Sequence, residues 1–341
     1  MSRSKPNFQQ IAELAGVSPS TVDRVLNDRG GVSEARRKKV LEAARKLGTG
    51  RVLPSPVRGS MHFDIIRTKA ENEFSRRMEQ ALQRVGSMLG KSIVLHRSVW
   101  ASEDQAPLVK FMTRPRHRRH GLIMVAGDTP EVRGALELAV GNGMPAVLMV
   151  NNLPGLGQHV PYVGVDNRAA GATGALLMGR FLRRAGRVLM LTGSSSFQPY
   201  RERSEGFAQV MRRDFPHLEL IGPVDMRDED ALAEAAVRSY LRGGTPLVGI
   251  YGNGQGTTGV DHALGRLAPE GLPVWITHES TPQHDALLRA GRIAALIDQD
   301  PEAQALHGMQ YLLYANHDGP APTVARTRFH IITAENALSA V

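Results

Sequence analysis

The spacing of apolar residues divides the chain into two parts. Up to residue 50 the apolar positions recur every three or four residues, which is typical of amphipathic helices. From residue 61 onward, short apolar runs such as FDII, GLIMVAG and PAVLMVN alternate with longer amphipathic stretches. This alternation predicts repeated β-α-β units around parallel sheets that are buried on both faces. The segment 51–60 between the two parts has two prolines and no apolar period, so we expect a linker there.

The first part predicts an all-α unit of three short helices. Asn7 begins a capping-box pattern, and Gly16 supplies the backbone freedom for a tight turn. Ser18 is placed to cap the second helix, with Pro19 at its first position, and Ser33 precedes the third. One apolar stripe from each helix should form the common core: Ile11, Leu14 and Ala15; Val22, Val25 and Leu26; Val40, Leu41, Ala44 and Leu47.

Polar side chains project from the second predicted helix. Two short helices around a glycine turn, with such a second helix, are typical of a helix-turn-helix that enters the DNA major groove. Arg24 has the reach for a bidentate contact to guanine. For Asp23, a contact to a cytosine amine, repulsion of phosphate and orientation of Arg24 all stay open. The candidate DNA-binding residues are Ser18, Pro19, Ser20, Thr21, Asp23, Arg24 and Asn27, with Leu53 and Val57 in the linker.

Positive charge is concentrated in the same part of the chain. Residues 1–58 contain twelve Lys or Arg against five Asp or Glu, a net charge of +7, while the whole chain carries +9. Neutralisation of phosphates supplies most of the sequence-independent affinity for DNA. The charge distribution therefore favours double-stranded DNA as a partner of the helical unit.

The run IAELAGVSPSTVDRVLN (11–27) resembles the DNA-binding head of LacI/GalR-type transcriptional regulators, whose pattern is roughly I-A-x-x-A-G-V-S-x-x-T-V-S-R-V-L-N. The sequence departs from that pattern at Asp23, where the family usually has serine. The resemblance implies a homodimer that reads a pseudo-palindromic operator, and a hinge helix that inserts an apolar wedge into the minor groove. Pro54 and Pro56 disfavour a regular helix in the linker, so a simple tether is the alternative.

The rest of the chain resembles the effector domain of the same regulators, a two-lobed, doubly wound α/β fold of the periplasmic-binding-protein type I kind. We expect a helix-turn-helix head at 1–50, a hinge or linker at 51–60 and the two-lobed domain at 61–341. The first lobe should comprise about 61–161 plus 298–320, and the second about 162–297 plus 321–341.

Ligands of open α/β sheets bind at the carboxyl ends of the strands. Asp, Asn and Arg beside aromatic walls are typical of sites for sugars, polyols and sugar acids. The family resemblance implies that Arg203 is the effector-binding arginine, with Asn253, Glu279 and Gln299 at matching positions. Asp166 is expected to cap a helix, Trp275 to lie in the core and the basic run 113–121 to be a solvated loop. The candidate effector residues are Asn72, Phe74, Asp128, Asn152, Phe197, Arg203, Asn253, Glu279, Asp298 and Gln299.

Several functional classes are excluded or disfavoured. The absence of cysteine excludes disulfides and thiolate chemistry. The sequence lacks both a signal-peptide pattern and an apolar run of the ~18 residues that span a bilayer, so we predict a cytoplasmic protein without a membrane partner. His278, Glu279 and His284 do not form a metal-ligand pattern, and GNGQG matches no nucleotide-binding motif, so no metal, cofactor or enzymatic activity is predicted. The sequence thus predicts a regulator, most simply a repressor, controlled by a small polar metabolite; a transporter's solute-binding protein and an α/β enzyme are the alternatives.

Overall fold

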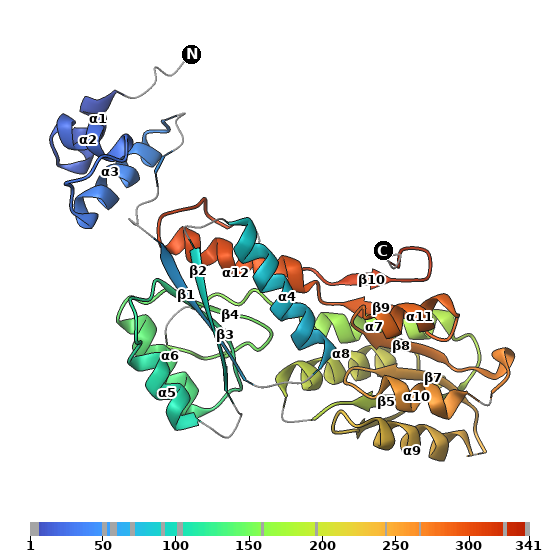
Figure 1. Cartoon of the computed structure of the whole chain (residues 1–341). Coiled ribbons are helices and arrows are strands. Elements are labelled where there is room, and N and C mark those ends of the chain that lie inside the picture. The colour runs from blue at the N-terminus through green and yellow to red at the C-terminus, as the bar shows by residue number, and fades with distance from the viewer. Residues whose placement is uncertain are drawn as a thin grey trace, which may run out of the picture.

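The computed structural model describes the chain except for short segments. Figure 1 shows a small helical head, joined at one end to a larger domain of two α/β lobes. Most of the predicted linker, including the candidate residue Val57, lies outside the described residues. The described residues are 7–49, 53–54, 60–68, 72–89, 93–100, 105–157, 160–194, 197–242, 244–265, 267–322 and 326–337.

The head contains the three predicted helices, α1 (Phe8–Ala15), α2 (Pro19–Leu26) and α3 (Glu34–Lys46). Their predicted caps are confirmed. Asn7 forms a complete capping box, and Ser18 accepts a hydrogen bond from the backbone N–H of Thr21. Gly16 ends α1 in the left-handed conformation at φ 64°, which a side chain would disfavour.

Two predicted core positions of the head are wrong. Leu14 is 51% exposed and Leu47 is 37% exposed, whereas the short side chains of Ala12 and Ala43 are buried. In α1, Ile11, Ala12 and Ala15 share one face at 100° per residue, and Leu14 lies outside it. The core of the head therefore contains fewer of the large apolar side chains than the sequence predicted.

The first lobe is built on a parallel sheet of order β2-β1-β3-β4. Helices α4 (Glu73–Met88) and α12 (Pro301–Ala315) pack on one face, and α5 (Gln105–Thr113) and α6 (Pro130–Gly141) on the other. Because α12 comes late in the sequence, the chain returns to the first lobe after building most of the second. The strands are β1 (Met61–Thr68), β2 (Ile93–Trp100), β3 (Gly121–Val125) and β4 (Ala146–Leu148).

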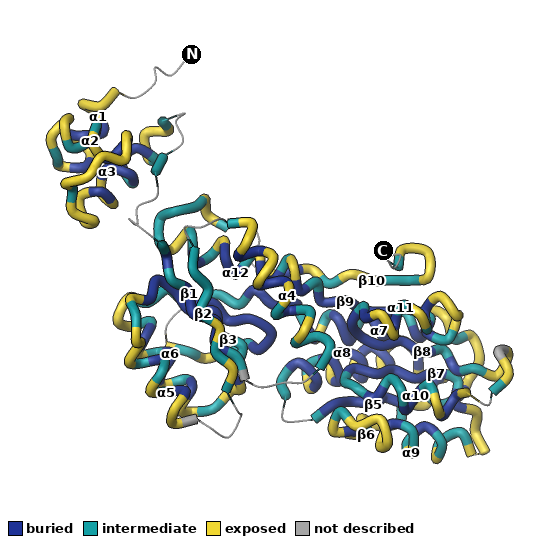
Figure 2. Tube along the Cα trace, in the orientation of Figure 1, coloured by how far each residue is buried: buried dark blue, intermediate teal, exposed yellow. Residues whose placement is uncertain are grey.

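The second lobe is built on a sheet of order β10-β9-β8-β7-β5-β6, in which only β10 is antiparallel. Trp275 is buried in this lobe, as predicted, and the inner strands of both sheets are dark blue in Figure 2. The strands are β5 (Gly186–Thr192), β6 (Leu218–Asp225), β7 (Leu247–Gly252), β8 (Val274–His278), β9 (Ala295–Asp298) and β10 (His330–Ile332). Helices α7 (Asn167–Phe181) and α8 (Gln198–Asp214) cover one face; α9 (Asp230–Leu241), α10 (Thr257–Leu264) and α11 (Pro282–Arg289) cover the other, and a short 3₁₀ turn, η1 (Pro269–Gly271), precedes β8.

The predicted strand YVGVD (162–166) belongs to neither sheet. Tyr162 forms a single bridge to Leu148, and the segment then leads from the first lobe into α7. Asp166 ends it by capping α7, as predicted, through a hydrogen bond from the N–H of Ala169. The apolar residues of this segment are buried because they cross between the lobes. None of the described helices is long and apolar enough to cross a membrane.

The basic run 113–121 is not simply a solvated loop, which corrects the prediction. Arg119 is buried, and its guanidinium lies 2.5 Å from the carboxylate of the fully buried Asp64 on β1. Nδ1 of His120 accepts the backbone N–H of His62 at 2.9 Å. Arg118 reaches Glu34 in the head, with an N–O distance of 2.6 Å. The run therefore anchors the first strand and contacts the head.

Replacing Asp64 by alanine should lower the free energy of unfolding by about 3–5 kcal/mol, because Arg119 would stay buried without its counter-charge. Asp128→Ala is the matched control, since the pair of Asp128 with Arg133 is much more exposed and should contribute at most about 1 kcal/mol. Urea unfolding followed by circular dichroism measures both variants. Equal, small losses would show that the buried pair does not stabilise this lobe.

Candidate functional site

A cavity of about 410 Å³ lies between the two lobes. This volume is typical of sites for small molecules. The first lobe contributes the beginning of α4 and the ends of β3 and β4, and the second contributes α8 and the segments after β7, β8 and β9. The cavity thus lies at the carboxyl ends of strands, where the sequence analysis expected a ligand.

Seven of the ten predicted effector residues line this cavity: Asn72, Phe74, Phe197, Arg203, Asn253, Glu279 and Gln299. Asp128 lies outside the lining, where Arg133 holds its carboxylate through two hydrogen bonds of 2.5 and 2.8 Å. Asn152 also lies outside it and accepts the N–H of Leu153, while its neighbour Asn151 lines the cavity instead. We therefore leave Asp128 and Asn152 out of the proposed site.

Asp298, the third residue outside the lining, connects the two lobes. Its two carboxylate oxygens accept hydrogen bonds from Arg77 of α4 at 2.6 and 3.1 Å. Burial opposes ionisation of this carboxyl, but the hydrogen bonds from Arg77 and from the N–H groups of Ser280 and Asp300 outweigh it and lower the pKa of Asp298. Asp298 is therefore ionised at neutral pH and holds the first lobe against the second.

Arg203 lies on α8, where close packing of two helices fixes its position. A side chain at Gly171 of α7 would lie 2.0 Å from the carbonyl oxygen of Arg203, so only glycine allows this approach. Arg203 as a whole is 3% exposed. Its Nε donates to Oδ1 of Asn167 at 2.9 Å, and another nitrogen donates to the carbonyl of Asn253 at 3.4 Å. A buried, positioned cation thus faces the cavity.

Two amide side chains present unused acceptors at the cavity. The Nδ2 group of Asn253 donates to Oγ of Ser204 at 2.8 Å and to the carbonyl of Tyr200 at 3.3 Å. Its Oδ1 atom is buried without a hydrogen-bond partner among the described residues, and so is Oδ1 of Asn151. Buried acceptors without partners are costly, so both oxygens favour a ligand that donates hydrogen bonds, such as a hydroxylated one.

Glu279 directly follows β8, and its carboxylate lies between an amide and a guanidinium group. One carboxylate oxygen accepts a hydrogen bond from Nε2 of Gln299, and the other lies 3.2 Å from Arg77. Burial and the nearby charge of Asp298 raise the pKa of Glu279 to about 7. This carboxyl can therefore donate or accept a hydrogen bond near neutral pH.

The raised pKa of Glu279 predicts a pH-dependent stability. Unfolded, this carboxyl titrates near its ordinary value of 4.5, so the folded chain binds more protons between pH 4.5 and 7. The free energy of unfolding should therefore fall as pH rises through this range, by about 3 kcal/mol for the full shift. Glu279→Gln, which carries no titrating proton, should lack this loss.

Urea unfolding at pH 5 and pH 8 tests the difference between the Glu279→Gln variant and the unchanged chain. Glu205→Gln is the control, because Glu205 is exposed on α8 and pairs with Arg168. If the Glu279→Gln variant and the unchanged chain lose stability in parallel between the two pH values, Glu279 does not titrate in this range.

The walls of the cavity combine aromatic rings with neutral histidines. Phe197 and Tyr200 meet edge to face, with ring centroids 5.1 Å apart. His278 is buried and its Nε2 lies 2.8 Å from the hydroxyl of Tyr251; burial and the charge of Arg203 keep the pKa of this histidine well below its ordinary value. Nδ1 of His284 lies 2.7 Å from the carbonyl of Glu279, so it donates there. These groups offer polar contacts without adding charge.

In the head, the outer side of α2 presents most of the predicted DNA-binding residues. Ser18, Pro19, Ser20, Arg24 and Asn27 are exposed, and Thr21 and Asp23 are half-buried. The carboxylate of Asp23 accepts from Nδ2 of Asn27 at 2.7 Å and pairs with Arg29 at 3.0 Å.

Two of the predicted DNA-binding residues, Arg24 and Leu53, contact other parts of the head. Nε of Arg24 donates to the carbonyl of Gly30 at 3.0 Å, and a side chain at Gly31 would lie 2.7 Å from its guanidinium. Arg24 therefore has to swing away from this turn to reach a base. Leu53 is half-buried and packs against the core of the head, which differs from the exposed wedge expected in the linker.

Two family models match the chain. Residues 63–316 match the periplasmic binding protein domain, and residues 7–48 match the bacterial regulatory proteins of the lacI family. Over its larger domain the chain belongs to the periplasmic binding protein family, and its head matches the lacI family of bacterial regulatory proteins. The matched segments fall on the two-lobed domain and on the head.

Two curated relatives carry the names of regulators. The HTH-type transcriptional regulator MalR of Streptomyces coelicolor is 27% identical over 59% of this chain, and that match spans 58% of the relative's own length. The ribose operon repressor of Halalkalibacterium halodurans is 23% identical, over 78% of each chain.

Among solved structures, a periplasmic solute-binding protein of Actinobacillus succinogenes with bound D-allose is similar to this chain. The match covers 82% of this chain and 99% of the chain of that protein, with 20% sequence identity and a TM-score of 0.72. This likeness supports the two-lobed fold of the larger domain.

Relative to the LacI/GalR pattern, the unusual Asp23 has a structural role in the head. Its carboxylate accepts hydrogen bonds from Asn27 and Arg29 at the turn that follows α2. The shorter side chain of serine could not reach both of these residues. These contacts are with Asn27 and Arg29 and not with Arg24, so they test none of the three roles that the sequence left open for Asp23.

Sequence reasoning missed Arg77, the cation that joins the two lobes. Arg77 lies in an amphipathic helix among other arginines, and its partners follow more than 200 residues later. The cavity-lining residues that sequence reasoning missed include Tyr200, His278, Thr281 and His284. Two kinds of position could have indicated them: the carboxyl end of a strand or the residues just after it, and the beginning of a helix.

Proposed function

We propose that the chain is a DNA-binding transcriptional regulator, acting as a repressor, whose affinity for its operator changes when a small polyhydroxylated metabolite binds between the lobes. One observation carries this proposal: a lacI-family head and a cavity with a buried arginine and unpaired amide acceptors occur in one chain. The names of the ribose operon repressor and of the D-allose complex support a sugar.

The chemistry of the cavity indicates the ligand class. Arg203 supplies a planar donor for adjacent oxygens, while the amide oxygens of Asn253 and Asn151 accept hydroxyl protons. Phe74 and Phe197 offer apolar surface for the C–H face of a sugar ring. A sugar, a polyol or a sugar acid satisfies these groups, and we propose a binding rather than a catalytic role for the cavity.

The mechanism we propose is thermodynamic linkage through the relative position of the lobes. Arg77 joins α4 to Asp298 and Glu279, so a ligand that contacts Glu279 acts on the same network that holds the lobes together. The first lobe carries the strand that follows the linker, and Arg118 contacts Glu34 in the head. Coupling of about 1–3 kcal/mol between the two sites is typical, and DNA must then change the affinity for the metabolite by the same factor.

We also propose that the active form is a homodimer in the cytoplasm. One head presents a single short helix, α2, to the major groove, and helix-turn-helix proteins gain specificity by placing two such helices one helical turn of DNA apart. Analytical ultracentrifugation with and without operator DNA tests this state. A monomer bound to a complete operator would contradict it.

The proposal is tested in two steps with the full chain. Thermal-shift screening of a panel of sugars, polyols and sugar acids identifies compounds that raise the melting temperature. Gel-shift experiments with genomic fragments then find the operator, and the identified compound is added. A chain that binds a sugar but no DNA would instead be a solute-binding protein, and one that binds neither would overturn the proposal.

A further inference from the structure

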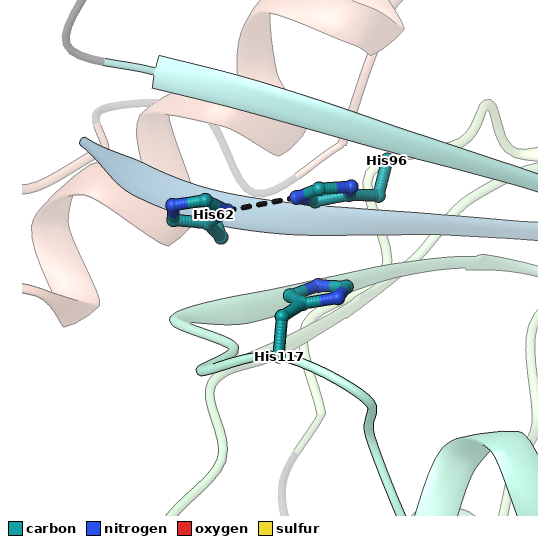
Figure 3. Close-up of side chains that lie close together, drawn as sticks. All are labelled: His62, His96 and His117. Atoms are coloured by element: carbon teal, nitrogen blue, oxygen red, sulfur yellow. Dashed lines mark hydrogen bonds between the residues drawn. The ribbon is translucent and has the colours of Figure 1, made fainter.

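Three histidines from separate segments meet in the first lobe, away from the cavity. His62 lies near the beginning of β1, His96 on β2 and His117 in the loop before β3 (Figure 3). One ring nitrogen of each lies within 4.8 Å of the other two. All three side chains are half-buried, so they are ordered by neighbours but open to solvent. This is the one histidine cluster with such spacing among the residues that the structure describes.

The hydrogen bonds of the three rings indicate which nitrogens can carry a lone pair toward an ion. Nδ1 of His62 lies 2.8 Å from Nε2 of His96, so one nitrogen carries a proton and the other carries a lone pair directed at it. Nε2 of His117 lies 2.9 Å from the carboxylate of Asp64. When Nε2–H donates to that carboxylate, Nδ1 of His117 carries the lone pair. A carboxylate behind a histidine is the usual support of a metal-bound imidazole.

We propose that His62, His96 and His117 form a binding site for a divalent transition-metal ion that prefers imidazole ligands, such as Zn²⁺. Three neutral imidazoles with a fourth position open to water suit this class of ion. His96 and His117 also line a shallow hollow of the surface, which gives the ion access. The carboxylate that contacts His117 belongs to Asp64. Asp64 is buried and paired with the buried Arg119, so this carboxylate is held in place.

Binding requires one local rearrangement. Zinc–nitrogen distances of about 2.0–2.1 Å place the ligand nitrogens of a tetrahedral site about 3.3 Å apart. The nitrogens of His62 and His96 are already closer than this, and the ion replaces the proton that they share. The rings of His96 and His117 are stacked, with centroids 3.9 Å apart, so the His117 ring has to turn its edge toward the ion. Its position in a loop allows this rotation.

The site would connect the segments that lead to the head. The N–H of His62 donates to His120, and Arg118 in the same loop pairs with Glu34 of α3. An ion bound by His62 and His117 therefore ties the strand that follows the linker to the loop that contacts the head. This role is independent of the metabolite cavity.

The test uses the full chain without a histidine tag, after removal of metal with a chelator. Zn²⁺ is titrated in competition with a chromophoric chelator, and Co²⁺ is added separately because tetrahedral cobalt absorbs strongly in the visible range. We expect one ion per chain and an intense cobalt spectrum. Each of His62→Gln, His96→Gln and His117→Gln should weaken zinc affinity at least about tenfold, since loss even of a supporting residue has an effect of this size.

His262→Gln is the matched control, because His262 is exposed on α10 in the other lobe and should leave zinc binding unchanged. Circular dichroism of each variant separates lost binding from lost folding, and His117→Gln, in a loop, is the variant best suited to keep the fold. Absence of zinc binding by the unchanged chain would overturn the proposal. So would equal affinity in the folded His117→Gln variant, or a weak, octahedral cobalt spectrum.

Discussion

Arg203→Ala should abolish the response to the metabolite and leave operator binding in its absence intact. Arg203 is 3% exposed and lies in the cavity between the lobes, remote from the head. Its removal leaves the oxygens of a bound ligand without their charged donor in a site of low dielectric constant. Losses of about 3–5 kcal/mol are typical when one partner of a buried charged pair is removed, so ligand affinity should fall at least about 100-fold.

Two companion variants make this result interpretable. Arg203→Lys keeps the charge but loses the planar pair of donors, so its ligand affinity should lie between those of Arg203→Ala and the unchanged chain. Arg212→Ala, on the exposed side of the same helix, should behave like the unchanged chain. Isothermal titration with the metabolite and fluorescence anisotropy with operator DNA measure the two affinities. An unaltered dose response in Arg203→Ala would remove this residue from the site.

Arg24→Ala should weaken binding to the operator by about 1–3 kcal/mol while changing binding to random DNA much less. The expected size is that of one bidentate contact between a guanidinium and a guanine. Arg24 is exposed on α2, and its hydrogen bond to Gly30 has to be given up before it turns toward a base. The loss should therefore be specific to sequence.

The salt dependence of binding separates base contacts from phosphate contacts. For a base contact, the slope of log affinity against log salt should stay nearly constant in Arg24→Ala, whereas loss of a phosphate contact lowers it by about one. Lys46→Ala, at the exposed end of α3, is the control for a general loss of positive charge. Equal losses on operator and random DNA would show that Arg24 contacts only phosphate.

Local signals made the head predictable from sequence. Asn7, Gly16, Ser18 and Pro19 each determine a cap or a turn through their own backbone or side-chain chemistry, and the structure confirms these positions. Core membership was less predictable. Leu14 is apolar yet exposed, because a helix of eight residues buries only one narrow face against its two neighbours.

Long-range partners explain what the sequence did not reveal. The buried pair of Asp64 and Arg119, and the bridge from Arg77 to Asp298, join residues 55 and 221 positions apart. The chain pattern shows each of these residues only as a charge in an apolar strand, a basic run or an amphipathic helix. His62, His96 and His117 likewise converge only after β1 and β2 pair in register, with Asp64 opposite His96.

Some residues of the cavity were predictable from local signals in the sequence, and others were not. The carboxyl ends of strands were recognisable from apolar runs, and the family resemblance then indicated Arg203, Asn253, Glu279 and Gln299, which all line the cavity. Asn151 and Asn152 are adjacent in sequence, and only the direction of the chain after β4 decides which of them lines the cavity. A sequence can therefore predict the segment that carries a contact more readily than the side chain that makes it.

The most direct test measures binding of the full chain to DNA by fluorescence anisotropy, at modest ionic strength. A genomic fragment containing the operator is compared with a shuffled duplex of equal length, with and without the metabolite found by thermal shift. We predict at least about 1,000-fold preference for the operator and a change of about five-fold or more on adding the metabolite. Equal affinity for both duplexes, with or without any compound of the panel, would contradict a DNA-reading head coupled to a metabolite-binding domain.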